Sequence, residues 1–469
     1  MITKSVTLKE CVRLIGGTLV RGNPGRVLYS ANRGSYRSLT SNQVYFIDTH
    51  QSVEKQLAAL RNHPVAAVVL PSDVPGSHIP ERTAIIRVRS VTDAYWRLAS
   101  WNWKQATPKH VVGITGSAGK STTTEMVYAV LKQRARVVHT RGNLNTFTFL
   151  PTYLLRLNPG DPILLLEMGM KSLNNIARQC RVVRPNVGVV TNVGEAHAGS
   201  LGGLDTVVKA KQELVDGMRP GGILYLNADC ARSRQLSTRR FYGTVRTFGI
   251  QNSADIRGEN IRYGTHGMSF DVRIRNEKFP CVIPHWGNHN VLNALAAIGI
   301  CLSLGYSKKE IQNGLARSRP PRMRLQLIRA KSGKLLINDA WNANPSAMKA
   351  GLTVLKNIAI GTKRIPIAVL GDMMELGRYT YTGHRDVGVH TANQSLSLLV
   401  TYGSNSREIG RTAISQGMDP KRVIHYSNRA ELIRFLKYAP QNSVIYFKGS
   451  RKLKMEKIVD DLARLPARG

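Results

Sequence analysis

The chain has 469 residues, which is enough for about two to four domains with sizeable hydrophobic cores. Its hydrophobic fraction of 42% and charged fraction of 20% are typical of a globular protein and exclude a low-complexity chain. The net charge of +38 is unusual, but aromatic residues make up only 6% and no recognition motif occurs, so we expect no nucleic-acid binding. General attraction of anionic substrates, or peripheral association with anionic surfaces, accounts for the charge equally well.

Neither a membrane span nor a secretion signal is evident. No apolar run approaches the roughly 20 residues that cross a bilayer, and residues 1–17 lack the order of a signal peptide. We therefore expect a cytoplasmic protein. The five cysteines are far apart and form no C-x-x-C pair, which predicts buried free thiols.

Residues 1–107 are predicted to form a small N-terminal α/β domain. Strand-like runs alternate with runs of helical spacing, and such alternation indicates crossover units and a mostly parallel sheet. The expected strands are 43–47, 66–70 and 83–88, and the expected helices are 8–15, 53–62 and 91–103. Pro108 marks the expected boundary.

A glycine-rich turn follows a short apolar strand at 111–115 and leads into a helix that begins at Lys120. Such a turn exposes backbone N–H groups at a helix N-terminus, where the helix dipole favours phosphate. The lysine reaches the terminal phosphates and the next hydroxyl ligates Mg²⁺. The match is to T-G-[ST]-x-G-K-[ST], because Ile114 stands where the longer P-loop pattern has its first glycine. The predicted ATP loop comprises Gly116, Ser117, Ala118, Gly119, Lys120, Ser121 and Thr122.

Two further buried strands of this central domain, residues 108–318, are followed by polar side chains. The strand at 163–167 ends on Glu167, and the strand at 187–193 is followed shortly by His197. A strand at 137–139 and a helix at 150–157 precede them. Because ligands lie beyond the carboxyl ends of parallel strands, these two side chains together with the P-loop predict a metal site.

Two later helices carry candidate ligands. Lys209 and Lys211 on a helix at 207–214 lie about 200° apart, so only one of them can face the site. The segment 285–294 opens another helix, whose histidine and asparagines offer donors and acceptors to a purine edge. N-capping by Asn288 is the structural alternative for that segment.

Residues 319–469 are predicted to form a Rossmann-like C-terminal domain. Four strands, 335–339, 367–372, 398–403 and 443–448, are separated by helices, which indicates a doubly wound sheet. The last strand leads into a Lys-Gly-Ser-Arg turn suited to an anion. The predicted fold class is therefore α/β in three domains, with the central P-loop domain as an ATP-binding parallel sheet.

From residue 111 to the C-terminus the motifs, in this order, resemble those of the Mur ligase family. They are TGSAGKSTTTEM (115–126), LLLEMGM (164–170), TNVGEAHAGSLG (191–202), KAKQEL (209–214), GNHNVLNALAA (287–297), RMRLQ (322–326), NDAWNANPSAMKA (338–350), LGDMMELG (370–377) and KGSRKLKMEK (448–457). The last three are most similar to those of the members that add D-alanyl-D-alanine to UDP-N-acetylmuramoyl-tripeptide.

The resemblance implies roles for particular residues. Lys120, Lys211 and His197 would be catalytic, and the metal ligands would be Ser121, Glu167, His197 and Lys211, the last as a carbamate. Beyond the P-loop, the ATP contacts would be His289, Asn290, Asn293, Arg324, Asp339 and Asn342. The substrate contacts would be Asn145, Thr146, Asn344, Lys448, Ser450 and Arg451.

The resemblance also implies a reaction, with ATP and Mg²⁺ as cofactors. ATP converts a carboxylate into an acyl phosphate, and an amine then attacks it to give an amide, ADP and phosphate. The substrates would be small molecules, namely a nucleotide-sugar peptide or another carboxylate acceptor and an amino acid or dipeptide, and we expect a monomer. This is a step in peptidoglycan precursor synthesis.

Two other functions remain open on the sequence. The first domain has Ser30-Ala31-Asn32-Arg33 where the family usually has D-S-R, and it lacks the family's glycine-rich stretch for the UDP group. A Mur-type ligase acting on a different acceptor, such as a natural-product or polymer precursor, is therefore one alternative. The other is a non-enzymatic anion-binding protein, suggested by the charge of +38.

Overall fold

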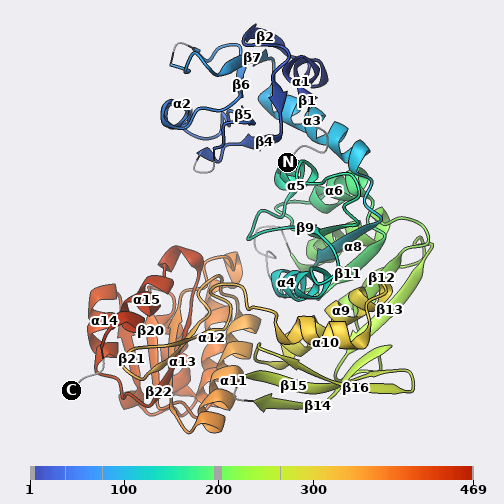
Figure 1. Ribbon diagram of the computed structural model, residues 1–469. Helices are drawn as coiled ribbons and strands as arrows, with labels where there is room; N and C mark the ends of the chain where they lie inside the picture. The colour runs from blue at the N-terminus through green and yellow to red at the C-terminus, as the bar shows by residue number, and fades with distance from the viewer. Residues whose placement is uncertain (1–5, 37–38, 77, 195–202, 265, 467–469) are drawn as a thin grey trace. The chain divides into compact units, whose positions relative to one another are not determined.

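A computed structural model describes residues 6–36, 39–76, 78–194, 203–264 and 266–466 (Figure 1). The chain forms two compact units, residues 1–112 with 134–166 and residues 113–133 with 167–469. The boundary between them passes through strands β8 (His110–Thr115) and β10 (Ile163–Glu167). The fold is α/β with several parallel sheets, as predicted, while the domain limits at 107 and 318 stay predictions.

The first unit contains a sheet in the order β2-β7-β6-β5-β4, in which all neighbours except β2 and β7 are parallel. Its core gathers Tyr45, Leu60 and Val68, so the strands are buried as the sequence predicted. The strands are β2 (Thr18–Arg21), β4 (Ser30–Arg33), β5 (Gln43–Phe46), β6 (Ala67–Pro71) and β7 (Ala84–Val88), with a separate antiparallel pair β1 (Val6–Thr7) and β3 (Val27–Leu28). The helices are α1 (Leu8–Ile15), α2 (Val53–Asn62) and α3 (Val91–Ala106).

The predicted helix at 150–157 is shorter in the structure. After the 3₁₀ turn η2 (Phe147–Phe149), α5 covers only Leu150–Leu154. The amide of Asn102 donates to the carbonyls of Leu154 (2.7 Å) and Leu157 (3.1 Å), so a buried side chain binds the last carbonyls of the turn. Sequence periodicity contains no sign of that distant partner. Nearby, β9 (Val137–His139) pairs in parallel with β10.

The strand before the glycine-rich turn, β8, belongs to a sheet of order β16-β15-β14-β13-β12-β11-β8-β10-β9. Strands β11 (Val187–Val190), β12 (Ile223–Asn227), β13 (Thr244–Gly249) and β14 (Ile256–Gly264) are parallel neighbours, and β15 (Gly267–Ile274) and β16 (Glu277–Ile283) extend the sheet in antiparallel fashion. The sequence analysis did not predict β12 to β16. The helices of this region are α4 (Lys120–Leu131), α6 (Asn175–Val183), α8 (Leu204–Gly217), α9 (Asn288–Ser303) and α10 (Lys308–Ala316).

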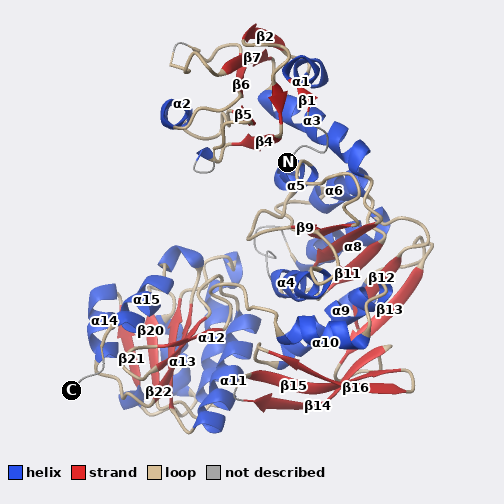
Figure 2. Ribbon diagram, viewed as in Figure 1, coloured by secondary structure: helices blue, strands red, loops and turns tan. Residues whose placement is uncertain are grey.

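The C-terminal sheet has the order β17-β18-β22-β19-β20-β21 and helices on both faces (Figure 2). It contains the four predicted strands, β18 (Leu335–Asn338), β19 (Ile365–Gly371), β20 (Leu398–Tyr402) and β22 (Ser443–Lys448). An antiparallel edge strand, β17 (Gln326–Arg329), and a parallel one, β21 (Val423–Tyr426), were not predicted. The remaining helices are α11 (Pro345–Thr362), α12 (Thr380–Ala392), α13 (Arg407–Ser415), α14 (Arg429–Lys437) and α15 (Glu456–Arg464).

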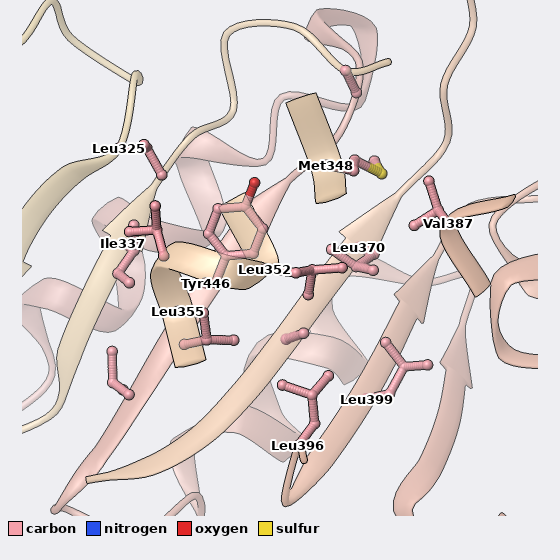
Figure 3. Packing of buried hydrophobic residues seen from close by; sticks show 14 of the residues in the cluster. Leu325, Ile337, Met348, Leu352, Leu355, Leu370, Val387, Leu396, Leu399 and Tyr446 are labelled. Carbon is pink, nitrogen blue, oxygen red and sulfur yellow. The ribbon is translucent and has the colours of Figure 1, made fainter. Parts of the chain in front are cut away.

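Alternate residues of these strands build two separate cores. Ile337 and Tyr446 point to α11, α12 and α13, whereas Leu336 and Ile445 point to α14 and α15. Figure 3 shows Tyr446 inside the first core, with its ring among leucines and its hydroxyl at the edge of the cluster. A strand buried on both faces reads as a continuous apolar run, which is why the sequence located these strands well. Within the described ranges, no helix is long and apolar enough to cross a bilayer.

Candidate active site

The glycine-rich turn connects β8 to α4, and its conformation requires glycine at two positions. Gly116 has φ +150° and Gly119 has φ +83°. A Cβ on Gly116 would overlap the hydroxyl of Thr191, and one on Gly119 would overlap the amide oxygen of Asn293. The turn is therefore packed closely between the end of β11 and helix α9.

Asn192, just after β11, holds the turn in place. Its carbonyl accepts from Ser117 N (3.0 Å) and its side-chain oxygen accepts from Ala118 N (2.8 Å). The Ser117 hydroxyl in turn accepts from Gly194 N (2.9 Å). The first amides of α4, from Lys120 onward, have no partner within the helix and form the anion-binding end of this turn.

Lys120 and Ser121 open the helix, as predicted. The Lys120 ammonium donates to the carbonyl of Gly116 at 2.7 Å and is half-buried. Burial lowers the pKa of Lys120, Glu167 opposes this shift, and the positive charge of Arg324 adds to it. The Ser121 hydroxyl donates to Glu167 Oε2 at 2.8 Å, so the hydroxyl of the turn and the carboxylate at the end of β10 lie side by side.

Lys211 is buried while Lys209 is exposed, in agreement with the helical spacing that allows only one to face inward. Lys211 is 1% exposed, and its ammonium lies 3.5 Å from the Met170 sulfur. Burial lowers the pKa of Lys211 well below its usual value, and the charge of Lys120 lowers it further. A lysine in this environment loses its proton readily.

A cavity of about 270 Å³ adjoins the turn and reaches the C-terminal sheet within the second unit. Its lining includes Ala118, Gly119, Thr122, His289, Asn290, Asn293, Arg324, Asp339, Asn344 and Lys448. These predicted ATP and substrate residues come from α4, α9, α11, β18 and β22 and their flanking loops, so the structure brings together residues more than 300 positions apart.

The start of α9 faces this cavity but is not capped as the structural alternative supposed. Gly287, and not Asn288, is the N-cap residue, and no side chain caps the helix. The Asn290 side chain donates to Trp286 O (2.8 Å) and accepts from the Asn293 side chain (3.0 Å), so the two asparagines are hydrogen-bonded to each other. His289 is exposed to solvent at the cavity.

Asp339 and Lys448 form a buried ion pair at the opposite wall. The Lys448 ammonium lies 2.6 Å from Asp339 Oδ2, which also accepts from the Tyr446 hydroxyl at 3.0 Å. Asp339 Oδ1 accepts from Leu325 N (3.1 Å), which fixes the segment that carries Arg324. Both residues of the pair line the cavity, but their charges compensate each other.

Other predicted residues lie outside this cavity lining. The side-chain amide of Asn342 donates to Glu375 Oε2 at 3.5 Å. Ser450 is buried and its hydroxyl accepts from Met374 N (2.8 Å). Arg451 pairs with Glu456 (2.7 Å) and faces the Trp341 ring, as Arg324 does, at 5.8 Å.

Two groups of predictions fall elsewhere. Asn145 and Thr146 precede η2 in the first unit. His197 lies outside the described residues. Across the part of the chain that the structure describes, no group of three or more histidine, cysteine or acidic side chains is gathered as a metal site.

Sequence reasoning missed several residues of the site. Asn192, Asn227 and His285 line the cavity, and so do Ser346 and Ala347 at the start of α11. Asn227 is the last residue of β12 and donates to Thr191 O at 2.8 Å. The position of polar residues at or just after the carboxyl ends of buried strands is a signal that could have identified Asn227 and Asn192.

His285 is expected to make the fold sensitive to acid. It is 2% exposed, it lies 3.0 Å from the Ser318 hydroxyl, and burial together with His289 lowers its pKa to about 4. The unfolded chain binds a proton near pH 6.5, so stability falls as the pH drops from about 6.5 toward 4. Between pH 7 and pH 5 the loss should be about 2 kcal/mol.

Urea unfolding at the two pH values tests this expectation. His285→Gln should reduce the acid-induced loss by that amount, whereas His63→Gln, at the exposed end of α2, should behave as the unchanged protein. An identical pH dependence in all three proteins would contradict it.

Comparison with known proteins places this site in a family. Residues 114–301 match the Mur ligase middle domain, and residues 323–451 match the Mur ligase glutamate ligase domain. The chain is 32% identical over 469 residues to a UDP-N-acetylmuramoyl-tripeptide–D-alanyl-D-alanine ligase of Bacillus subtilis, across 98% of this chain and 99% of the relative. The chain belongs to the Mur ligase family and is an ATP-dependent, ADP-forming ligase.

Solved structures agree with this assignment. MurF from Acinetobacter baumannii is 25% identical and superposes with a TM-score of 0.84 over 99% of this chain and 100% of that one. The MurF ligase of Thermotoga maritima, solved in complex with ADP, shares the fold with a TM-score of 0.76 at 23% identity, over 92% of this chain and 97% of that one. Because the chain belongs to this family of ligases, the non-enzymatic alternative is wrong.

Proposed function

We propose that this enzyme joins D-alanyl-D-alanine to the tripeptide of UDP-N-acetylmuramoyl-tripeptide, with conversion of ATP to ADP and phosphate. The observation that carries the proposal is the Bacillus subtilis relative of that name, which matches 98% of the chain. The match includes the N-terminal region, where motifs depart from the family pattern, so a different acceptor is not favoured. The enzyme would act in the cytoplasm, as a monomer, in peptidoglycan precursor synthesis.

The reaction requires a nucleotide phosphate to meet a carboxylate. Transfer of the γ-phosphoryl group to the carboxylate gives an acyl phosphate, and the amine of the dipeptide then displaces phosphate to form the amide. Catalysis of such a transfer depends on positioning and on charge stabilisation. Lys120 and the first amides of α4 would hold the phosphates, and Arg324 would approach them from the cavity side.

The other polar residues would bind the nucleotide and the substrates. His289, Asn290 and Asn293 would contact the base, and Asn344 and Lys448 would line the opposite wall. Asn342, Ser450 and Arg451 would border the site from the C-terminal domain. The acyl phosphate must be kept from water, and a small cavity enclosed by elements of two sheets suits that requirement.

A magnesium ion fits the residues at the turn. The Ser121 hydroxyl and the Glu167 carboxylate supply oxygen ligands, which Mg²⁺ prefers. The two oxygens lie 2.8 Å apart. These two residues would hold one ion, and His197 and a carbamylated Lys211 would contribute to a second. Bound Mg²⁺ supplies neutralisation of negative charge on the transferring phosphoryl group.

The buried Lys211 is suited to carbamylation. Its lowered pKa provides the neutral amine, which adds to carbon dioxide with loss of one proton and yields a carboxylate-like group. With ¹³C-labelled bicarbonate, the protein is expected to show a carbamate carbonyl signal in ¹³C NMR. Lys211→Ala should abolish the signal and lower kcat about 10²-fold.

Lys209→Ala is the matched control, because that lysine lies on the same helix but is exposed. It should retain both the signal and the activity. Full activity of Lys211→Ala would contradict the role assigned to the lysine.

The activity itself is tested with purified enzyme, ATP, Mg²⁺, UDP-N-acetylmuramoyl-tripeptide and D-alanyl-D-alanine. We expect phosphate release that depends on both substrates, and a product whose mass increases by that of the dipeptide minus water. If phosphate release fails with this pair but occurs with another carboxylate and amine, the proposed acceptor is wrong and the ligase assignment stands.

A further inference from the structure

A second hollow lies beside the short ladder between strands β13 and β14 of the central sheet. Strands β13 and β14 pair at Phe248–Ile256 and Gly249–Arg257, so only the end of β13 lies beside the start of β14. The hollow there has a volume of about 1010 Å³ and shares no lining residue with the nucleotide cavity. Its lining includes four arginines, Arg246, Arg257, Arg273 and Arg275.

Three cations lie directly opposite one another across neighbouring strands. Arg257 of β14 is the register partner of Arg273 of β15, which is the partner of Lys278 of β16. Like charges in directly opposed positions destabilise a sheet. This row therefore needs negative charge from elsewhere.

The acidic residues nearby are engaged with other groups. Glu259 binds Arg273 at 2.8 and 3.0 Å, and Asp271 lies 3.1 Å from Lys278. Asp255 accepts from Thr247 N (2.7 Å) and faces Arg246 at 3.4 Å, and Glu277 pairs with Lys308 (2.8 Å). Two members of the row, Arg273 and Lys278, are thus neutralised by carboxylates of the adjacent strands.

Arg257 is the exception. Its Nε is buried, and within the described residues it has no hydrogen-bond partner. The positive charge of Arg257 acts on Glu259, but the carboxylate oxygens of Glu259 contact Arg273 and Lys278. A guanidinium N–H without an acceptor is costly, and among the residues that the structure describes no carboxylate pairs with Arg257 as Glu259 and Asp271 do with the other two cations, so a bound anion would compensate its charge.

We infer that this hollow binds a phosphorylated small molecule with at least two negative charges, at a site separate from the nucleotide cavity. The planar guanidinium of Arg257 matches phosphate oxygens in pairs, and the exposed Arg275 of the lining adds a second positive charge. Tyr225, the aromatic residue of the lining, is buried with its hydroxyl bound to Gly299 O (2.7 Å), so the hollow selects for phosphate and not for a stacked base. The phosphate could belong to a free metabolite or to a lipid headgroup.

Titration calorimetry with inorganic pyrophosphate tests the inference, on full-length enzyme saturated with ADP and Mg²⁺ so that the P-loop is filled. We expect saturable binding that Arg257→Gln weakens at least tenfold. Arg262→Gln removes the same charge from an exposed position of the same strand outside the hollow, and should leave binding unchanged. Retained ADP affinity in both variants shows that the fold and the nucleotide site are intact.

Sedimentation with phosphatidylcholine vesicles, with and without phosphatidic acid, separates the two sources. Vesicle binding that requires both phosphatidic acid and Arg257 assigns the phosphate to a lipid, whereas pyrophosphate binding alone assigns it to a free molecule. Equal affinity in Arg257→Gln and the unchanged enzyme, equal weakening by Arg262→Gln, or no pyrophosphate binding at all would overturn the inference. These outcomes leave the ligase activity untouched.

Discussion

Replacing Lys120 with alanine is expected to lower the rate of phosphate release about 10³-fold, while the enzyme remains folded. The ammonium is held at the mouth of the turn by Gly116 O, and no other lysine begins α4. Since the transferred phosphoryl group carries its charge on oxygens that this ammonium would contact, its loss removes stabilisation specific to the transition state. Steady-state phosphate release with saturating substrates measures the effect.

The matched control is Lys132→Ala, at the other end of the same helix. Lys132 is exposed and lies over the Tyr128 ring, so its removal should change kcat less than twofold, which is about 0.4 kcal/mol. If Lys120→Ala raised only the KM for ATP and left kcat unchanged, the lysine would bind ATP equally in the ground and transition states. That result would contradict its catalytic role.

The parts of the site that the sequence predicted are those determined by short-range pattern. The strand, turn and helix around Gly116 follow from an apolar run and glycines within ten residues, and helical geometry predicted that only one of Lys209 and Lys211 faces inward. The family resemblance then supplied residues from the C-terminal domain. That these residues and the P-loop line one cavity depends on the tertiary structure, which no local sequence pattern encodes.

The parts that were missed depend on distant partners. Asn192 holds the turn from a position 74 residues away from Ala118, and Asn102 ends α5 from 52 residues away. Strands β14 to β16 alternate buried and exposed residues with many charges, so they present no continuous apolar run. The row of cations there emerges only once the register of the strands is known.

The largest effect on stability is expected for Asp339→Ala, at about 3–5 kcal/mol. The carboxylate accepts from Lys448, from the Tyr446 hydroxyl and from Leu325 N, and all three groups are buried. Its removal leaves a cation, a hydroxyl and an amide without their acceptor inside the C-terminal domain. The cost is the desolvation of these groups rather than the strength of one contact.

Two comparisons make the cause of the loss measurable by urea unfolding. Asp386→Ala breaks an ion pair of 2.8 Å with Lys349 that is exposed, and should cost less than about 1 kcal/mol. The double variant Asp339→Ala/Lys448→Met should be more stable than Asp339→Ala, because it no longer buries an unpaired charge. If the double variant were less stable than the single one, Lys448 would stabilise the fold by its packing alone, and the buried ion pair would not explain the loss.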